Sequence, residues 1–109
     1  MNSIRLTSSI VAASLFLGTS AFADTDKKTE RTWKAKCASC HGQDGKGDTD
    51  KGKQLKIEDM TTAAFQAKSN DALKSATLDG FKKDMPAFKA ELSPEQADAL
   101  VAYMRTFKK

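Results

Sequence analysis

The feature that most constrains this chain is Cys37-Ala38-Ser39-Cys40-His41, which holds both cysteines and the single histidine of its 109 residues. Two thiols three residues apart lie on one helical turn, and His41 lies one turn after Cys37. This spacing lets both thiols bond one edge of a flat macrocycle while the imidazole reaches a metal at its centre. The pattern is typical of covalent haem c attachment, so we expect a fold built around that group.

Two other uses of a Cys-x-x-Cys pair were weighed against haem attachment. A zinc site needs four ligands, and the chain has no further Cys or His outside this motif. A thiol–disulfide module of the thioredoxin type needs a βαβ context, and no segment alternates apolar and polar residues as a half-buried strand does. A disulfide between Cys37 and Cys40 would close too small a loop to stabilise the fold much. Haem attachment is the preferred interpretation.

The first 23 residues have the pattern of a secretory signal peptide. They carry one charged side chain, Arg5, and an apolar stretch over residues 10–17. That stretch is shorter than the roughly 20 residues needed to cross a bilayer. Small residues at Ala21 and Ala23 fit cleavage after Ala23. We expect a cleaved leader (1–23) and one domain (24–109) exported to the periplasm, with an uncleaved membrane anchor as the alternative.

The mature domain is predicted to be all-α, with about four short helices and long loops wrapped around one covalently attached haem. Loss of the leader leaves 86 residues and lowers the formal net charge from +4 to +3. A chain of this size with long loops usually needs a bound group at its centre. We expect a monomer that binds no nucleic acid and, after cleavage, has no stable membrane insertion.

Capping residues place the predicted helices. The first covers residues 29–41, and residues 42–52, with four glycines, are expected to form a loop. Thr61 or Thr62 can cap a short helix through residue 67, and Ser69 can cap another that ends near Leu78, before Gly80.

The last helix has the strongest signals. Ser93 is its expected N-cap, Pro94 takes the first helical position, and Gln96 completes a capping box. An apolar stripe then follows at helical spacing, formed by Ala97, Leu100, Val101, Met104 and Phe107.

Haem iron has two axial positions, and His41 accounts for one. Because no second histidine exists, the candidates for the other are the thioethers of Met60, Met85 and Met104. Met104 lies on the apolar stripe and Met60 at the end of a loop, so both are expected to pack. Pro86 favours an extended backbone at Met85, which can turn its thioether out of a loop toward the haem. Met85 is the predicted ligand, with Met60 or an open position as alternatives.

Over residues 24–109 the chain resembles the small class I cytochromes c of bacteria. The resemblance implies that the first and last helices cross and that the haem is wedged between them and the loop carrying the methionine ligand. Its most specific motif is Cys-x-x-Cys-His-Gly. The supporting features are Trp33 four residues before the first cysteine, the Gly-Lys-Gly loop, Asp59-Met60, Met85-Pro86-Ala87-Phe88, and the Leu92–Gln96 entry into the last helix.

One departure from this family concerns the orientation of His41. The ring N–H that does not face the iron is expected to be held by a carbonyl or a carboxylate. Many members of the family use the carbonyl of a proline twelve residues after the histidine, where this chain has Lys53. A backbone carbonyl can still accept that proton, but the residue that supplies it is left open.

These features predict an electron carrier rather than an enzyme, with iron cycling between Fe(II) and Fe(III) while His41 and Met85 stay bound. The expected partners are redox proteins that donate and accept the electron. Lys82 and Lys83 precede the predicted ligand and favour an acidic docking surface on the partner. Further lysines that can extend this basic rim are Lys46, Lys51, Lys53 and Lys56, interleaved with Asp44, Asp48, Asp50 and Asp84.

The alternative function is a haem-based peroxidase or small-gas sensor with labile methionine ligation. Such a site usually needs a distal acid–base group. The chain has no spare histidine, and Asp84 is the only acid beside Met85. The carrier interpretation is therefore preferred.

Overall fold

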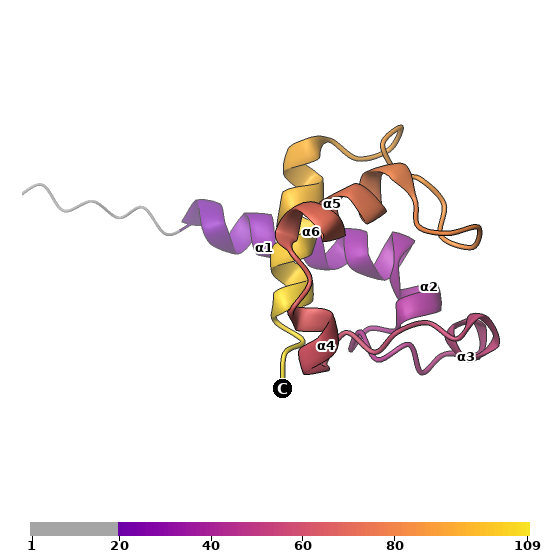
Figure 1. The fold of residues 1–109 in the computed structure, drawn as a ribbon. Helices are drawn as coiled ribbons and strands as arrows, with labels where there is room; N and C mark the ends of the chain where they lie inside the picture. Colours follow the sequence, from indigo (N-terminus) through magenta and orange to yellow (C-terminus); the bar gives the residue numbers. More distant parts are fainter. Residues whose placement is uncertain (1–19) are drawn as a thin grey trace, which may run out of the picture.

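Six helices form within residues 20–109, the part of the chain described by the computed structural model. In this part the only β-type pairing is an isolated bridge between Phe81 and Met85, which confirms the all-α prediction. Helix α6 packs against both α1 and α5, and Figure 1 shows α1 and α6 crossing. The helices are α1 (Ser20–Lys36), α2 (Ala38–His41), α3 (Asp50–Leu55), α4 (Ala63–Gln66), α5 (Asn70–Asp79) and α6 (Pro94–Arg105).

The predicted caps of the last three helices are confirmed. Thr62 and Ser69 each accept a hydrogen bond from the backbone N–H three residues on, at the starts of α4 and α5. Gly80 ends α5 with a φ of +88°. Ser93 and Gln96 form a complete capping box at the start of α6. Each cap supplies a partner for a backbone N–H that the helix itself leaves unpaired.

The first half of the chain differs from the prediction in two ways. The predicted helix over residues 29–41 begins earlier, at Ser20, and is interrupted at Cys37, so it forms two helices. Residues 21–36 contain neither Gly nor Pro, and nothing stops α1 from extending toward the N-terminus. The predicted loop over residues 42–52 also ends early, because the Thr49 hydroxyl accepts from the Gly52 N–H and starts α3 at Asp50.

Most of the predicted leader, residues 1–19, lies outside the described residues, and the predicted cleavage point after Ala23 falls within α1. Within residues 20–109 no helix is both long enough and apolar enough to span a bilayer.

The core lies where α1 crosses α6. Trp33 of α1 has no exposed surface, and its ring centre lies 5.6 Å from that of Tyr103 and 5.2 Å from that of Phe107. Gly45 makes room for Phe107, since a Cβ at Gly45 would stand only 2.5 Å from that ring. The remaining core residues are Met60, Phe65, Leu73, Leu92, Leu100, Val101 and Met104.

Candidate functional site

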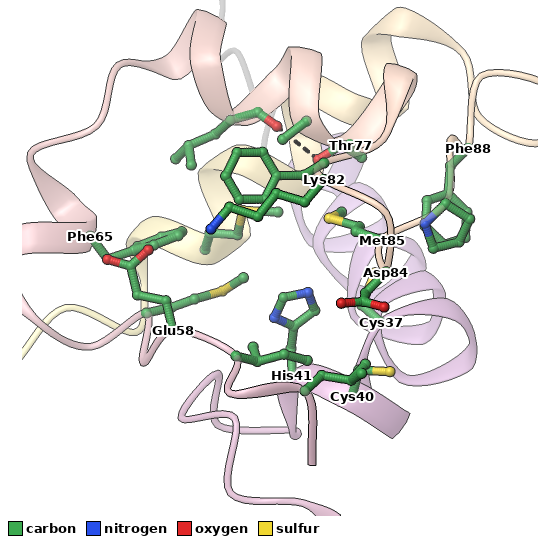
Figure 2. A pocket seen from close by; sticks show the side chains of 18 of the residues that line it. Cys37, Cys40, His41, Glu58, Phe65, Thr77, Lys82, Asp84, Met85 and Phe88 are labelled. Atoms are coloured by element: carbon green, nitrogen blue, oxygen red, sulfur yellow. Dashed lines mark hydrogen bonds between the residues drawn. The ribbon is translucent and has the colours of Figure 1, made fainter. Parts of the chain in front are cut away.

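A largely apolar cavity of about 580 Å³ lies between α2, α5 and the loop that follows α5. Its volume falls within the roughly 300–1,000 Å³ typical of small-molecule and cofactor sites. All four predicted site residues line it: Cys37, Cys40, His41 and Met85. Figure 2 shows the His41 ring pointing into the cavity toward the side that carries Met85, with both cysteines beside His41.

The two cysteines are free thiols on one turn of backbone. Cys37 N–H donates to the Trp33 carbonyl at 2.8 Å, and His41 N–H donates to the Cys37 carbonyl at 2.9 Å, so the turn continues α1 despite the interruption. Burial raises the pKa of the Cys37 thiol to about 11. A thiol that stays protonated at neutral pH is a poor nucleophile for disulfide exchange. This environment disfavours a thiol-redox role for Cys37.

Burial also lowers the pKa of His41, so its imidazole is neutral at pH 7, the form that binds metals. Within the described residues Nδ1 is buried and has no hydrogen-bond partner. Nε2 is the ring nitrogen left open to the cavity. The expectation that a carbonyl or carboxylate holds the second ring nitrogen is therefore wrong for this structure. An unpaired buried donor at Nδ1 costs about 1–3 kcal/mol.

Hydrogen bonds from three directions fix the backbone around His41. The indole N–H of Trp33 donates to the Gly42 carbonyl at 2.9 Å, and the Thr49 hydroxyl donates to the Cys40 carbonyl at 2.8 Å. Gly47 N–H donates to the His41 carbonyl at 2.8 Å. The sequence analysis did not identify the contributions of Thr49 and Gly47. A threonine just before the acidic start of a helix is the signal that could have identified Thr49.

Close backbone packing adds a further constraint on this side of the cavity. A Cβ at Gly52 would lie 2.6 Å from the Cys40 carbonyl oxygen and 2.3 Å from that of Gly47. Only glycine lets α3 approach α2 this closely.

Met85 is held by a tight turn on the opposite side of the cavity. Phe81 and Met85 exchange two backbone hydrogen bonds, of 3.1 and 3.2 Å, across residues 82–84. Lys82 closes the turn with a φ of +52°, in the left-handed region. Gly80 is needed at its base, since a Cβ there would stand 2.8 Å from the Met85 carbonyl oxygen.

The other two candidate methionines line the same cavity but are more buried. Met60 and Met104 are 5% and 4% exposed and belong to the core, whereas Met85 is half-buried and lies in a loop. The side-chain amide of Gln66 links the backbone at these two methionines, since it donates to the Met60 carbonyl at 2.7 Å and to the Met104 carbonyl at 3.1 Å. The packing roles expected for these two methionines agree with their burial.

Charged side chains and one aromatic ring surround the mouth of the cavity. Phe81 is the exposed large hydrophobic residue of the described chain, at 49%. The ammonium groups of Lys68 and Lys82 lie 5.8 and 5.3 Å from its ring centre. Lys68 also pairs with Glu58 at 2.7 Å.

The predicted basic rim is only partly found at the cavity. Lys56 and Lys82 line it, and so do Lys36 and Lys68, which the sequence analysis did not include. Lys53 instead pairs with Asp48 at 3.2 Å. The other predicted rim lysines, Lys46, Lys51 and Lys83, do not line the cavity.

The donor set fits haem c. The described residues bring together two free thiols, a neutral imidazole nitrogen and a thioether around an apolar space, and they contain no cluster of three or more His, Cys, Asp or Glu able to hold a bare metal ion. Thiols for attachment with imidazole and thioether for axial ligation are the requirements of this cofactor.

Comparison with known proteins agrees with this assignment. The sequence profile of the family described as "Cytochrome C oxidase, cbb3-type, subunit III" matches residues 24–104, and the chain belongs to this family of c-type cytochrome domains. A solved structure named "KustC0563 c-type cytochrome" is 34% identical, with a TM-score of 0.70 over 74% of this chain and 98% of that chain. A mutant of that protein is 32% identical, with a TM-score of 0.67 over 73% and 98%. No curated protein gives a significant match.

The family and the fold together define a small class I cytochrome c, as the resemblance implied. Such a protein contains covalently bound haem c and takes part in electron transport.

Proposed function

We propose that this protein is a monomeric one-electron carrier of the periplasm, in which Cys37 and Cys40 hold haem c while His41 and Met85 bind its iron. The observation that carries the proposal is the arrangement of these side chains around one cavity. His41 lies beside the two thiols, and Met85 faces it from the loop opposite (Figure 2). This arrangement supports the proposal, because the imidazole and the thioether would each reach an iron held in the cavity between them.

The chain's own residues set the properties of the site. When bound, haem c supplies the one-electron couple of its iron. His41 would hold the iron through Nε2 and Met85 through its sulfur, and if both stay bound in the two oxidation states, little reorganisation would accompany electron transfer. A thioether raises the reduction potential relative to a second histidine, and burial by apolar walls such as Phe65 and Leu73 raises it further.

Axial ligation is tested by comparing two methionine variants. We expect Met85→Ala to abolish the weak long-wavelength band of thioether-bound ferric haem, lower the potential, and open the iron to cyanide or carbon monoxide. Met60→Ala is the control, since it removes a buried methionine of the same cavity and should leave the band in place. The reverse pattern would assign the ligand to Met60. Wild-type protein that lacks the band and binds carbon monoxide readily would favour the peroxidase or sensor alternative.

Covalent attachment is tested by replacing both thiols. The variant carrying Cys37→Ser and Cys40→Ser should lose its haem to acid–acetone extraction, whereas wild-type protein should retain it. A double variant that keeps its haem through extraction would overturn the proposed attachment.

Export is tested by the mass of the protein recovered from the periplasm. Cleavage after Ala23 predicts a chain that begins at Asp24. Full-length protein retained in the membrane fraction would instead support the uncleaved anchor.

Docking to an acidic partner surface is supported by the lysines at the cavity mouth, of which Lys82 is exposed and lines the cavity. Brief redox encounters favour charge steering over a tight complex. Electron-transfer rates with an acidic partner should fall as salt rises past about 0.1 M, where the screening length is about 10 Å. Changing Lys82 and Lys83 to Glu should flatten or invert that dependence. The charge-matched control, with Lys108 and Lys109 changed to Glu, should retain the wild-type slope.

A further inference from the structure

The turn that carries Met85, called here the Met85 turn (residues 81–85), is attached at one end to α5. Just after it, the Phe88 N–H donates to the Thr77 carbonyl at 3.1 Å. The two hydrogen bonds between Phe81 and Met85 lie within the turn, so they close it but do not attach it to the other side of the cavity mouth. Any such attachment has to come from side chains.

Lys68, which lies between α4 and α5, contacts both sides of that mouth. Its ammonium group lies 5.8 Å from the ring centre of Phe81, in the Met85 turn, and 5.7 Å from that of Phe65. The same group pairs with the Glu58 carboxylate at 2.7 Å. Both Lys68 and Glu58 line the cavity.

Glu58 belongs to the part of the chain that supports His41. The residue before it, Ile57, donates its N–H to the Gly52 carbonyl at 2.9 Å. Ile57 also packs against Gly47, where a Cβ would lie 3.1 Å from the Ile57 carbonyl oxygen. Gly47 in turn donates to the His41 carbonyl at 2.8 Å. Lys68 therefore links the His41 side of the mouth to the Met85 turn.

The backbone of Lys68 is itself anchored to α6. The Arg105 guanidinium donates to the Lys68 carbonyl at 2.6 Å and to the Gln66 carbonyl at 3.0 Å. It also donates to the Asn70 side-chain oxygen at 2.8 and 3.2 Å. The side chain of Lys68 thus extends across the mouth from a fixed base.

Charge explains why Glu58 is part of this arrangement. The ammonium group of Lys82 lies 5.3 Å from the same Phe81 ring, so two cations approach one aromatic side chain. Like charges this close repel each other, and the Glu58 carboxylate offsets the charge of Lys68. Lys82 belongs to the Met85 turn itself, so its contact with Phe81 does not hold that turn to another segment.

We propose that Lys68 is a positioning residue that holds the Met85 turn closed across the cavity mouth and thereby slows the release of Met85 from the iron. Opening the turn would separate the Phe81 ring from the Lys68 ammonium group. The side chains of Lys68 and Glu58 are 38% and 44% exposed, so these contacts act on local opening far more than on global stability. The inference rests on the proposed ligation by Met85, and it gives the carrier a barrier against the external ligands that a peroxidase or sensor admits.

The first test is the rate at which imidazole displaces Met85 in the ferric holoprotein, followed through loss of the long-wavelength band. At saturating imidazole this rate is limited by the release of Met85. Lys68→Met keeps the apolar stem and removes the charge, so it should raise the limiting rate about fivefold, as expected for one exposed cation–π contact and one exposed ion pair. Lys68→Arg should stay within about twofold of wild type, because a guanidinium keeps the charge and stacks on aromatic rings.

Lys74→Met is the matched control. The Lys74 side chain is 31% exposed and pairs with Asp98 of α6 at 3.0 Å, so the control removes a similar ion pair away from Phe81. Its limiting rate should equal that of wild type. Equal rates for Lys68→Met and Lys74→Met would overturn the inference and leave the proposed ligation intact.

The role of Phe81 is tested by adding Lys68→Met to a Phe81→Leu variant. The ring is already absent from that background, so Lys68→Met should raise the rate by less than about twofold there, as expected for two residues that act through one contact. The full increase in that background would show that Lys68 does not act through Phe81, and would overturn the inference.

Amide exchange of the holoprotein tests the closure of the turn without reference to the iron ligand. The Met85 N–H donates to the Phe81 carbonyl at 3.2 Å and is released when the turn opens. Its exchange should be about fivefold faster in Lys68→Met than in Lys74→Met, while that of Gly47 is unchanged. Equal exchange of Met85 would overturn the closure. Wild-type protein without the long-wavelength band would instead overturn the ligation, and with it the effect on ligand release.

Discussion

The two sides of the haem cavity are built differently. On the His41 side, the indole of Trp33, the hydroxyl of Thr49 and the backbone of Gly47 all bond the turn that carries the histidine, and α3 packs against it without an intervening side chain. On the Met85 side, the ligand candidate lies at the end of a short exposed turn closed by its bridge to Phe81. The turn that carries His41 is therefore bonded to three other segments, whereas the turn before Met85 is closed by hydrogen bonds between its own two ends.

The largest expected effect comes from truncating Trp33, which packs in the core and also hydrogen-bonds the turn that carries His41. Trp33→Ala should lower the free energy of unfolding by about 3–5 kcal/mol, because a fully buried large ring is removed. The matched change on the loop side is Phe81→Ala. Because Phe81 is half exposed, its loss should cost far less, within about 0.5 kcal/mol. Denaturant unfolding of the two holoproteins measures both, and equal losses would contradict the comparison.

A hydrogen-exchange experiment would sharpen the contrast without mutation. The amides of Phe81 and Met85 should exchange through local opening, well before those of His41 and Gly47, which open only with the core. The measurement is exchange of the reduced holoprotein followed by NMR. Equal protection on the two sides would show that the loop is as firmly held as the histidine turn.

Thr49→Ala should lower the free energy of unfolding by about 1–2 kcal/mol, near the upper end of the range for a lost N-cap. The hydroxyl both caps α3 and donates to the Cys40 carbonyl, so two hydrogen bonds are lost. Thr62→Ala is the control. It also removes an N-cap and two hydrogen bonds, but the Thr62 hydroxyl donates at an exposed position, to the Asp59 carbonyl, and bonds no residue of the turn that carries His41, so the change should cost less. Thermal or denaturant unfolding distinguishes the two.

The smallest expected effect is on the stability of the fold at low pH, and it involves Asp59, the residue before Met60. Hydrogen bonds from the side chain and the backbone N–H of Thr61 hold the pKa of Asp59 below its ordinary value. The ionised carboxylate therefore contributes stability above the pKa of the unfolded chain, and this contribution is lost as the pH falls below about 4. Asp59→Asn should therefore reduce the loss of stability between pH 6 and pH 3, measured by denaturant unfolding at each pH. If the variant and the wild type lose the same free energy of unfolding over this range, the assignment to Asp59 is wrong.

Helix boundaries could be predicted from the sequence where the capping residues act on backbone close to them in the chain. Ser69, Gly80 and the Ser93–Gln96 box act on backbone within a few residues, and the helices they delimit were predicted correctly. Thr49 is also a local cap, but the three glycines before it and Gly52 after it favoured a loop and hid α3.

The candidate site could be predicted where the spacing of residues along one helix determines which side chains lie together. The motif alone placed Cys37, Cys40 and His41 together, and Pro86 directed attention to the loop of Met85. Long-range partners gave no such signal. The bond from Trp33 to Gly42 and the contact of Lys68 with Phe81 depend on how separate segments pack.

The position of Trp33 gives the protein an internal optical reporter. It is the single tryptophan of the chain, and its ring lies beside that of the proposed iron ligand. A haem held by His41 would absorb the excitation energy of the indole before it can be emitted, so the folded holoprotein should be almost non-fluorescent. Separation of α1 from the cavity would restore the emission. Its intensity would then measure directly, in real time, how far the first helix has moved from the cofactor.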